Sequence, residues 1–206
     1  MGDRLDGWRQ TVADWSRGRS WIARLPLWLF FVYLAARYLR DPRYQSVFGG
    51  LNLGIHELGH VVFGPFGQTL GIAGGTILQC AAPVVSVVMF CRQRDAFALS
   101  FSCAWMATNL YGVAVYMADA RAMAMPLVSP FGGDVYHDWN YLLDRAGWLA
   151  YDTRLASWVR MLAAAFMLAS LVYGAWVLWV MARPEDGRNG PQTTDDGPLR
   201  ENTTEH

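Results

Sequence analysis

Residues 47–66 have the sequence VFGGLNLGIHELGHVVFGPF, an apolar segment from which the fold can be inferred. Its twenty residues match the length that an α-helix needs to cross the apolar core of a membrane. The segment also contains Asn52, His56, Glu57 and His60, whose polar side chains are costly in lipid unless other helices shield them. It therefore predicts a helix that is surrounded by further membrane helices.

The rest of the chain supplies those further helices. The chain is 53% hydrophobic and only 17% charged, which is outside the usual range for soluble domains. Apolar runs of nearly spanning length occur at residues 25–39, 70–91, 96–118 and 155–182. We therefore predict an all-α fold, a polytopic membrane helical bundle of about five transmembrane helices within a range of about four to six.

The run at 70–91 is the best packing partner for the segment at 47–66. It begins with Gly71, Gly74 and Gly75, small residues whose spacing lets two helix backbones approach closely. It also contains Gln79, a polar residue in an otherwise apolar run. We expect these two helices to pack against each other.

The remaining segments divide the chain into parts. Residues 1–20 are polar, with arginines between tryptophans, and suit a polar or amphipathic N-terminal segment at the membrane surface. Residues 21–183 form the membrane domain, and its connection at 119–154, too polar to span, predicts a structured interfacial or re-entrant segment before the last helix. Residues 184–206 have no apolar periodicity and predict a disordered tail.

The charge of the chain indicates mainly which partners are not expected. The net charge is zero and all 17 basic residues are arginines, so nothing favours a nucleic-acid partner. The expected partner is the membrane lipid bilayer, and we expect a multi-pass integral membrane protein of a bacterial-type inner or plasma membrane. Arginines are shared almost equally between the two sides, so orientation rests on the expectation that the N-terminus is cytoplasmic.

The polar residues of the first segment form an HExxH motif. His56 and His60 are four residues apart, so both imidazoles lie on one face of a helix and can bind a single metal ion, with Glu57 beside them. In such sites zinc activates a bound water and the glutamate serves as general base. The pattern predicts a Zn²⁺ cofactor, with His56 and His60 as metal ligands and Glu57 as the catalytic residue.

The composition of the chain makes a chance match a poor explanation. Only four histidines and four glutamates are present, and Glu57 is the only glutamate before residue 184. Shuffling this composition would give the motif on the order of once in a thousand chains. The alternative is that these residues form hydrogen bonds between helices or a proton relay without metal.

A zinc site needs a further protein ligand. His137 is the first choice because imidazole is a favoured zinc ligand, and Asp138 or Asp134 would complete the shell or orient a histidine. If this stretch is helical, all three residues lie on one face, at i, i+3 and i+4. The alternative is a helix start at the membrane surface, capped by Asp134, with His137 in solvent.

The segment from 47 to 91 resembles the site-2-protease-like family of intramembrane zinc metallopeptidases. The resemblance rests on the run Ile55-His56-Glu57-Leu58-Gly59-His60-Val61-Val62 and on the glycine-rich turn that follows it. In that family the motif lies on a transmembrane helix and a distant aspartate completes the zinc site. The resemblance implies the same zinc-binding and general-base roles for the three motif residues.

The later part of the chain departs from the family pattern. The Asn-Pro and Leu-Asp-Gly motif of the family is absent, and Gly133-Asp134 with His137-Asp138 stands in its place. The chain therefore looks like a divergent relative, in which Asp134 or His137 would supply the ligand that the aspartate normally provides. Residues 21–183 would then be a metallopeptidase-like domain.

Two functions follow from these features. The first is a zinc-dependent membrane metallopeptidase that hydrolyses a peptide bond at or within the bilayer, with a membrane-protein substrate. The second is a non-catalytic metal-binding subunit or scaffold of a larger membrane complex, with partner subunits. Both functions retain the metal site and differ in whether Glu57 activates a water.

Overall fold

The computed structural model describes residues 2–126 and 136–183, and every regular element in these ranges is a helix. The predicted all-α fold is confirmed. The predicted tail at 184–206 lies outside the described residues, as does Asp134. The elements in chain order are α1 (Gly2–Ser16), α2 (Leu25–Arg40), α3 (Gly49–Phe63), η1 (Gly64–Phe66), α4 (Gln68–Gln93), α5 (Ala96–Ala118), α6 (Asp138–Arg145), η2 (Leu149–Tyr151) and α7 (Asp152–Ala182).

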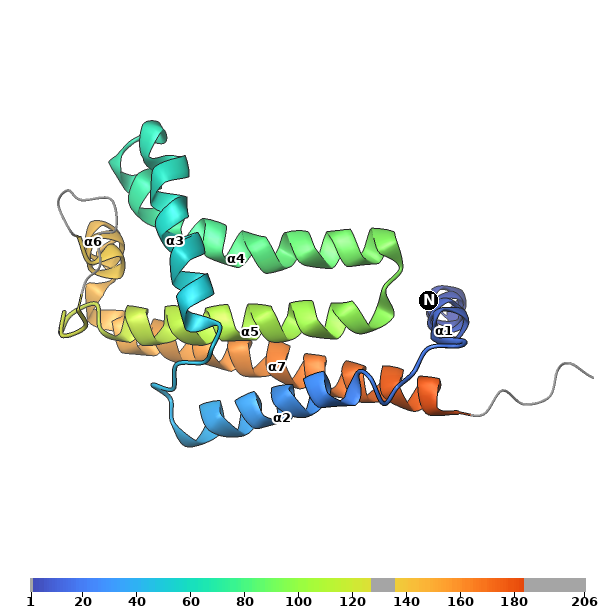
Figure 1. Ribbon diagram of the computed structural model, residues 1–206. Helices are drawn as coiled ribbons and strands as arrows, with labels where there is room; N and C mark the ends of the chain where they lie inside the picture. Colours follow the sequence, from blue (N-terminus) through green and yellow to red (C-terminus); the bar gives the residue numbers. More distant parts are fainter. Residues whose placement is uncertain (1, 127–135, 184–206) are drawn as a thin grey trace, which may run out of the picture.

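Three of these helices are long and apolar enough to cross a membrane. Helices α4, α5 and α7 have 26, 23 and 31 residues, and their axes are nearly parallel, with α2 beside them (Figure 1). Helices α4 and α7 keep many large apolar side chains exposed, as lipid-facing helices do, while α5 lies between its neighbours and is mostly buried. These properties are those of a membrane protein.

The prediction of five spans is corrected to three candidate spans within the described residues, because α2 and α3 are too short. They have 16 and 15 residues. At about 1.5 Å per residue they are about 24 and 22 Å long, less than the roughly 30 Å of a membrane core. Helix α3 also crosses the long helices at a steep angle instead of running beside them (Figure 1).

The early end of α3 has a local cause. Pro65 lies in the single 3₁₀ turn η1 that follows Phe63, and Gly67 after it has a positive φ of 105°. That conformation favours glycine and reverses the chain direction. The apolar run at 47–66 is therefore divided between a short helix and a turn, which the length of the run alone did not reveal.

The long helices α5 and α7 form the rigid centre of the bundle. Ser100 Oγ donates to the Ser170 carbonyl oxygen at 2.8 Å, and Ser170 Oγ donates to the Ser100 carbonyl oxygen at 2.7 Å. Ala104, Ala107 and Ala163 are fully buried around them. Small side chains let the two backbones approach, and the paired hydroxyl groups satisfy each other away from water.

Helix α6 lies at one end of this centre, nearly perpendicular to the long helices (Figure 1). Asn140 Nδ2 donates to the Ala120 carbonyl oxygen at 2.8 Å, which ties α6 to the end of α5. Arg121 contacts both carboxylate oxygens of the buried Asp152, at 2.8 and 2.7 Å, and so links the same end to the start of α7. The described part of the connection at 119–154 is thus structured.

Candidate metal site

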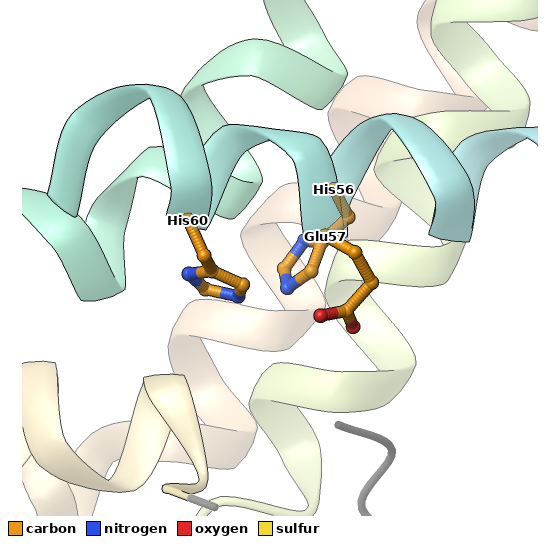
Figure 2. A group of neighbouring side chains, drawn as sticks. All are labelled: His56, Glu57 and His60. Atoms are coloured by element: carbon orange, nitrogen blue, oxygen red, sulfur yellow. The ribbon is translucent and has the colours of Figure 1, made fainter. Parts of the chain in front are cut away.

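The motif residues lie together on one side of α3. His56, Glu57 and His60 project in the same direction (Figure 2), and their ligand atoms lie within 4.8 Å of one another. His56 is buried, while Glu57 and His60 are partly exposed. The helical spacing has the effect predicted from the sequence, since it brings two imidazoles and a carboxylate to one point.

Close packing of α3 on α4 makes room for the two rings. A Cβ atom at Gly59 would overlap the backbone of Gly74, so the two helices meet at their glycines. A Cβ atom at Gly75 would lie 2.7 Å from the His56 ring and 2.8 Å from the His60 ring. The predicted packing of these two segments is confirmed, and its glycines define the space that the imidazoles fill.

Both histidine rings are oriented by acceptors on α4. His56 Nδ1 lies 3.0 Å from Gln79 Oε1, and His60 Nδ1 lies 2.9 Å from the Gly71 carbonyl oxygen. Each Nδ1–H donates to its oxygen, so Nε2 is the ring nitrogen that faces Asp138 and would bind a metal ion. Metal-binding histidines are commonly held in this way, with the second ring nitrogen donating to a fixed acceptor.

Asp138 contacts the other ring nitrogen, Nε2, of both histidines. Its Oδ2 atom lies 2.8 Å from His56 Nε2 and 3.3 Å from His60 Nε2. With metal–ligand bonds of about 2.0 Å, ligand atoms of a tetrahedral zinc are about 3.3 Å apart. The identity of these three atoms suits zinc, and the distance from His60 to Asp138 matches the spacing of its ligands, whereas the distance from His56 to Asp138 is that of a hydrogen bond, which a metal ion would replace.

Asp138 carries a negative charge in this position. Burial alone would raise the pKa of its carboxyl group, but hydrogen bonds from His56 and His60 outweigh burial and lower the pKa below its usual value. The group is therefore ionised at neutral pH. A carboxylate must be ionised to bind a metal ion, so its charge state fits the role of third ligand.

The position of Asp138 depends on how α6 begins. His137 is the N-cap residue, and its Nδ1 accepts the Asn140 N–H at 3.2 Å. The Asp138 backbone N–H donates to the Tyr116 hydroxyl at 3.1 Å. Asp138 is thus the first residue of a capped helix and is also tied to α5, which fixes where its carboxylate points.

His137 faces a different part of the structure. Its ring centroid is 4.3 Å from that of Tyr116, and its Nε2 lies 3.4 Å from Asp119 Oδ2. The predicted i, i+3, i+4 face required a helix that includes residues 134–138. Helix α6 begins only at Asp138, and His137 has an extended backbone with a ψ of 104°, so the two neighbouring side chains point in different directions.

A cavity of about 710 Å³ opens beside the site, and the three motif residues and Asp138 line it. Its other walls come from the loop before α3, from α4 and α5, and from residues 125 and 126. A volume of this size accommodates several amino-acid residues or a small ligand. Glu57 therefore faces a space in which another molecule can lie next to the two histidines.

Two residues of the site were not assigned a role from the sequence. From the sequence, Gln79 is only a polar residue in an apolar run, and Tyr116 has no distinguishing feature. A buried glutamine in a membrane helix is a signal for a hydrogen-bond partner, but its partner His56 is 23 residues away. Tyr116 is one of nine tyrosines, and nothing in its sequence neighbourhood distinguishes it.

Comparison with known protein families, with curated proteins and with solved structures finds no match for this chain. The chemistry of the site is therefore inferred from its own residues.

Proposed function

We propose that this protein is a zinc-dependent membrane metallopeptidase, with His56, His60 and Asp138 as the metal ligands and Glu57 as the general base. The observation that carries the proposal is the meeting of both Nε2 atoms with the Asp138 carboxylate. Two imidazoles and a carboxylate are a common ligand set of catalytic zinc, which keeps a fourth position open. The relation to the site-2-protease-like family is part of the same proposal.

Different residues would bind the metal, transfer the proton and orient the metal ligands. When bound, zinc would act as a Lewis acid and lower the pKa of water. Glu57 would take a proton from the attacking water and return it to the leaving amine. Gln79 and the Gly71 carbonyl group would keep the two imidazoles in their binding orientation.

The position of the site at one end of the bundle indicates from which side a substrate would enter. Helices α3 and α6 lie at one end of the long helices (Figure 1). If those helices cross a bilayer, as a multi-pass protein of a bacterial-type inner or plasma membrane would, the site lies near one membrane surface. We propose a membrane-protein substrate whose cleaved bond enters the cavity beside Glu57 from that surface.

The test compares wild type with Glu57→Gln in purified protein. Zinc per chain is measured by mass spectrometry, and hydrolysis is followed with a set of fluorogenic peptides and a membrane-anchored reporter. Glu57→Gln removes the base but no ligand, so zinc should stay bound while hydrolysis falls by about 10²- to 10⁴-fold. Asp144→Asn is the control, because it makes the same carboxylate-to-amide change at an exposed position of α6.

Zinc bound without hydrolysis in either form, together with a stable protein partner, would contradict the peptidase proposal. It would support instead a metal-binding subunit of a larger membrane complex. Equal hydrolysis by wild type and Glu57→Gln would contradict the role of Glu57.

A further inference from the structure

Helix α1 packs across the C-terminal end of α7, at the opposite end of the bundle from the metal site (Figure 1). One stripe of α1 makes the contact, with Trp8, Val12 and Trp15 at helical spacing. Val12 is fully buried in a cluster with Val177 and Met181 of α7. The contact fixes α1 to the bundle and turns its polar face outward.

The orientation of α1 is that of a helix at a membrane surface. It is seen end-on in Figure 1, whereas α7 runs across the view, so the two helices are nearly perpendicular. If α7 crosses a bilayer, α1 lies along its surface, where amphipathic helices bind. Trp176 and Trp179 lie in the last two turns of α7, and in that orientation they would lie at the membrane interface, which tryptophan prefers.

A second cavity, of about 610 Å³, lies between these two helices. Its described lining includes four arginines and two indole rings but no carboxylate. The arginines come from both partners, since three belong to α1 and the turn after it and one follows α7. These six residues are Arg9, Arg17, Arg19, Arg183, Trp176 and Trp179.

The cavity keeps a positive charge after its nearest ion pairs are counted. Arg17 lies 2.6 Å from Asp14 and Arg9 lies 3.8 Å from Asp6, and neither aspartate lines the cavity. Among the described residues, four guanidinium groups against two carboxylates leave a net charge of +2. The Arg183 guanidinium lies over the Trp179 ring, which forms part of the cavity wall, and its central carbon is 3.4 Å from the ring centroid.

We propose that this cavity binds the headgroup of an anionic phospholipid. Guanidinium groups match phosphate oxygens in charge and geometry, and several of them from two helices can surround one phosphate. Leu168, Val172 and Trp179 form an exposed apolar stripe on α7 that leads away from the cavity, with 62%, 61% and 53% of their surface exposed. Acyl chains would lie along this stripe, which favours a lipid over free phosphate.

The test uses detergent-solubilised full-length protein titrated with phosphatidylglycerol or phosphatidylcholine, with bound lipid counted by native mass spectrometry. Each arginine near an anionic headgroup contributes about fivefold in affinity. The double variant Arg17→Gln with Arg183→Gln, one change on each side of the cavity, should therefore bind phosphatidylglycerol about 25-fold more weakly and lose its preference over phosphatidylcholine. Arg183→Gln alone should lose about fivefold.

The matched control is the double variant Arg37→Gln with Arg40→Gln, which removes two arginines from the last turn of α2 at the other end of the bundle. It should bind phosphatidylglycerol as wild type does. Inorganic phosphate should compete only weakly, because it lacks acyl chains. Equal binding of the two lipids, an equal loss in the control, or phosphate binding as tight as that of phosphatidylglycerol would each overturn the proposal. The proposal does not depend on the metal site, and none of these variants touches it.

Discussion

The interface between α5 and α7 and the interface between α3 and α4 are both built from small residues, but they serve different purposes. In the first, Ser100 and Ser170 donate to each other's carbonyl oxygens, and the polar groups are satisfied within the interface. In the second, Gly59 and Gly74 bring the backbones together, and the space at Gly75 holds two imidazole rings. Close packing of α5 on α7 forms the scaffold of the bundle, and we call this contact the scaffold interface. Close packing of α3 on α4 forms the candidate metal site.

The difference explains why α3 is short and steeply inclined. A helix in a scaffold gains stability by running beside its neighbours over its whole length. Helix α3 instead crosses the end of the bundle and turns His56, Glu57 and His60 toward α6 and the cavity. We expect only substitutions between α3 and α4 to change zinc binding, whereas stability depends on both interfaces, and four substitutions test this expectation.

Gly59→Ala should have the largest effect. The added Cβ would meet the Gly74 backbone, which cannot move without separating α3 from α4. We expect the free energy of unfolding to fall by about 3 kcal/mol, at the upper end of overpacking effects. Unfolding followed by circular dichroism in detergent measures it. Gly174→Ala is the comparison in the interface between α5 and α7, where the three atoms nearest the added Cβ belong to the side chains of Ser100 and Trp28. An equally large loss of stability there would contradict the distinction between a backbone obstacle and a side-chain obstacle.

Gly75→Ala should weaken zinc binding about a hundredfold with a smaller loss of stability. Its Cβ would displace both imidazole rings, whereas the nearest obstacles are side chains and not backbone. A competition titration with a zinc indicator measures the affinity. Gly112→Ala is the matched control, since its Cβ would lie 4.0 Å from the nearest group, Gln79 Nε2. Unchanged zinc affinity in Gly75→Ala would show that the rings do not need this space.

Gln79→Leu should weaken zinc binding by about 10- to 30-fold, because His56 loses the acceptor that orients its ring. Gln79→Glu keeps an oxygen acceptor and should restore most of the affinity. Ser86→Ala, at another buried polar position of α4, serves as control because its hydroxyl bonds to Ser102 away from the site. If Gln79→Leu and Ser86→Ala changed the affinity equally, the orienting role of Gln79 would be wrong.

Ser170→Ala should have the smallest effect, a loss of about 1 kcal/mol in the free energy of unfolding with unchanged zinc affinity. It removes a hydroxyl that donates to the Ser100 carbonyl oxygen inside the scaffold interface. Hydrogen bonds between membrane helices typically contribute this much or less. The same unfolding and zinc titrations measure both quantities, and a clear drop in zinc affinity would mean that the two interfaces are not independent.

The sequence predicted the elements whose signals are local. Apolar runs located all of the long helices, and the four-residue spacing of His56 and His60 placed both rings on one face of α3. Three glycines and a glutamine in the run at 70–91 correctly indicated its packing partner. Each of these inferences needs only the period of a helix and the size of a side chain.

The rest depends on where helices begin and on contacts between distant segments. Whether His137 or Asp138 faces the two motif histidines depends on the first residue of α6, which sequence patterns locate poorly. A helix that starts at Asp138 makes His137 a cap and turns its ring toward Asp119. Asp138 reaches His56 over 82 residues of chain, and no local pattern records such a contact.

The most direct test of the metal site is the zinc affinity of Asp138→Asn compared with that of His137→Asn. The two residues are adjacent in sequence, and asparagine at position 137 can still cap α6. We expect wild type and His137→Asn to bind a single zinc ion per chain with similar affinity, and Asp138→Asn to bind it at least about a hundredfold more weakly. Zinc binding that is unchanged in Asp138→Asn, or lost in His137→Asn instead, would contradict the assignment of Asp138 as the third ligand.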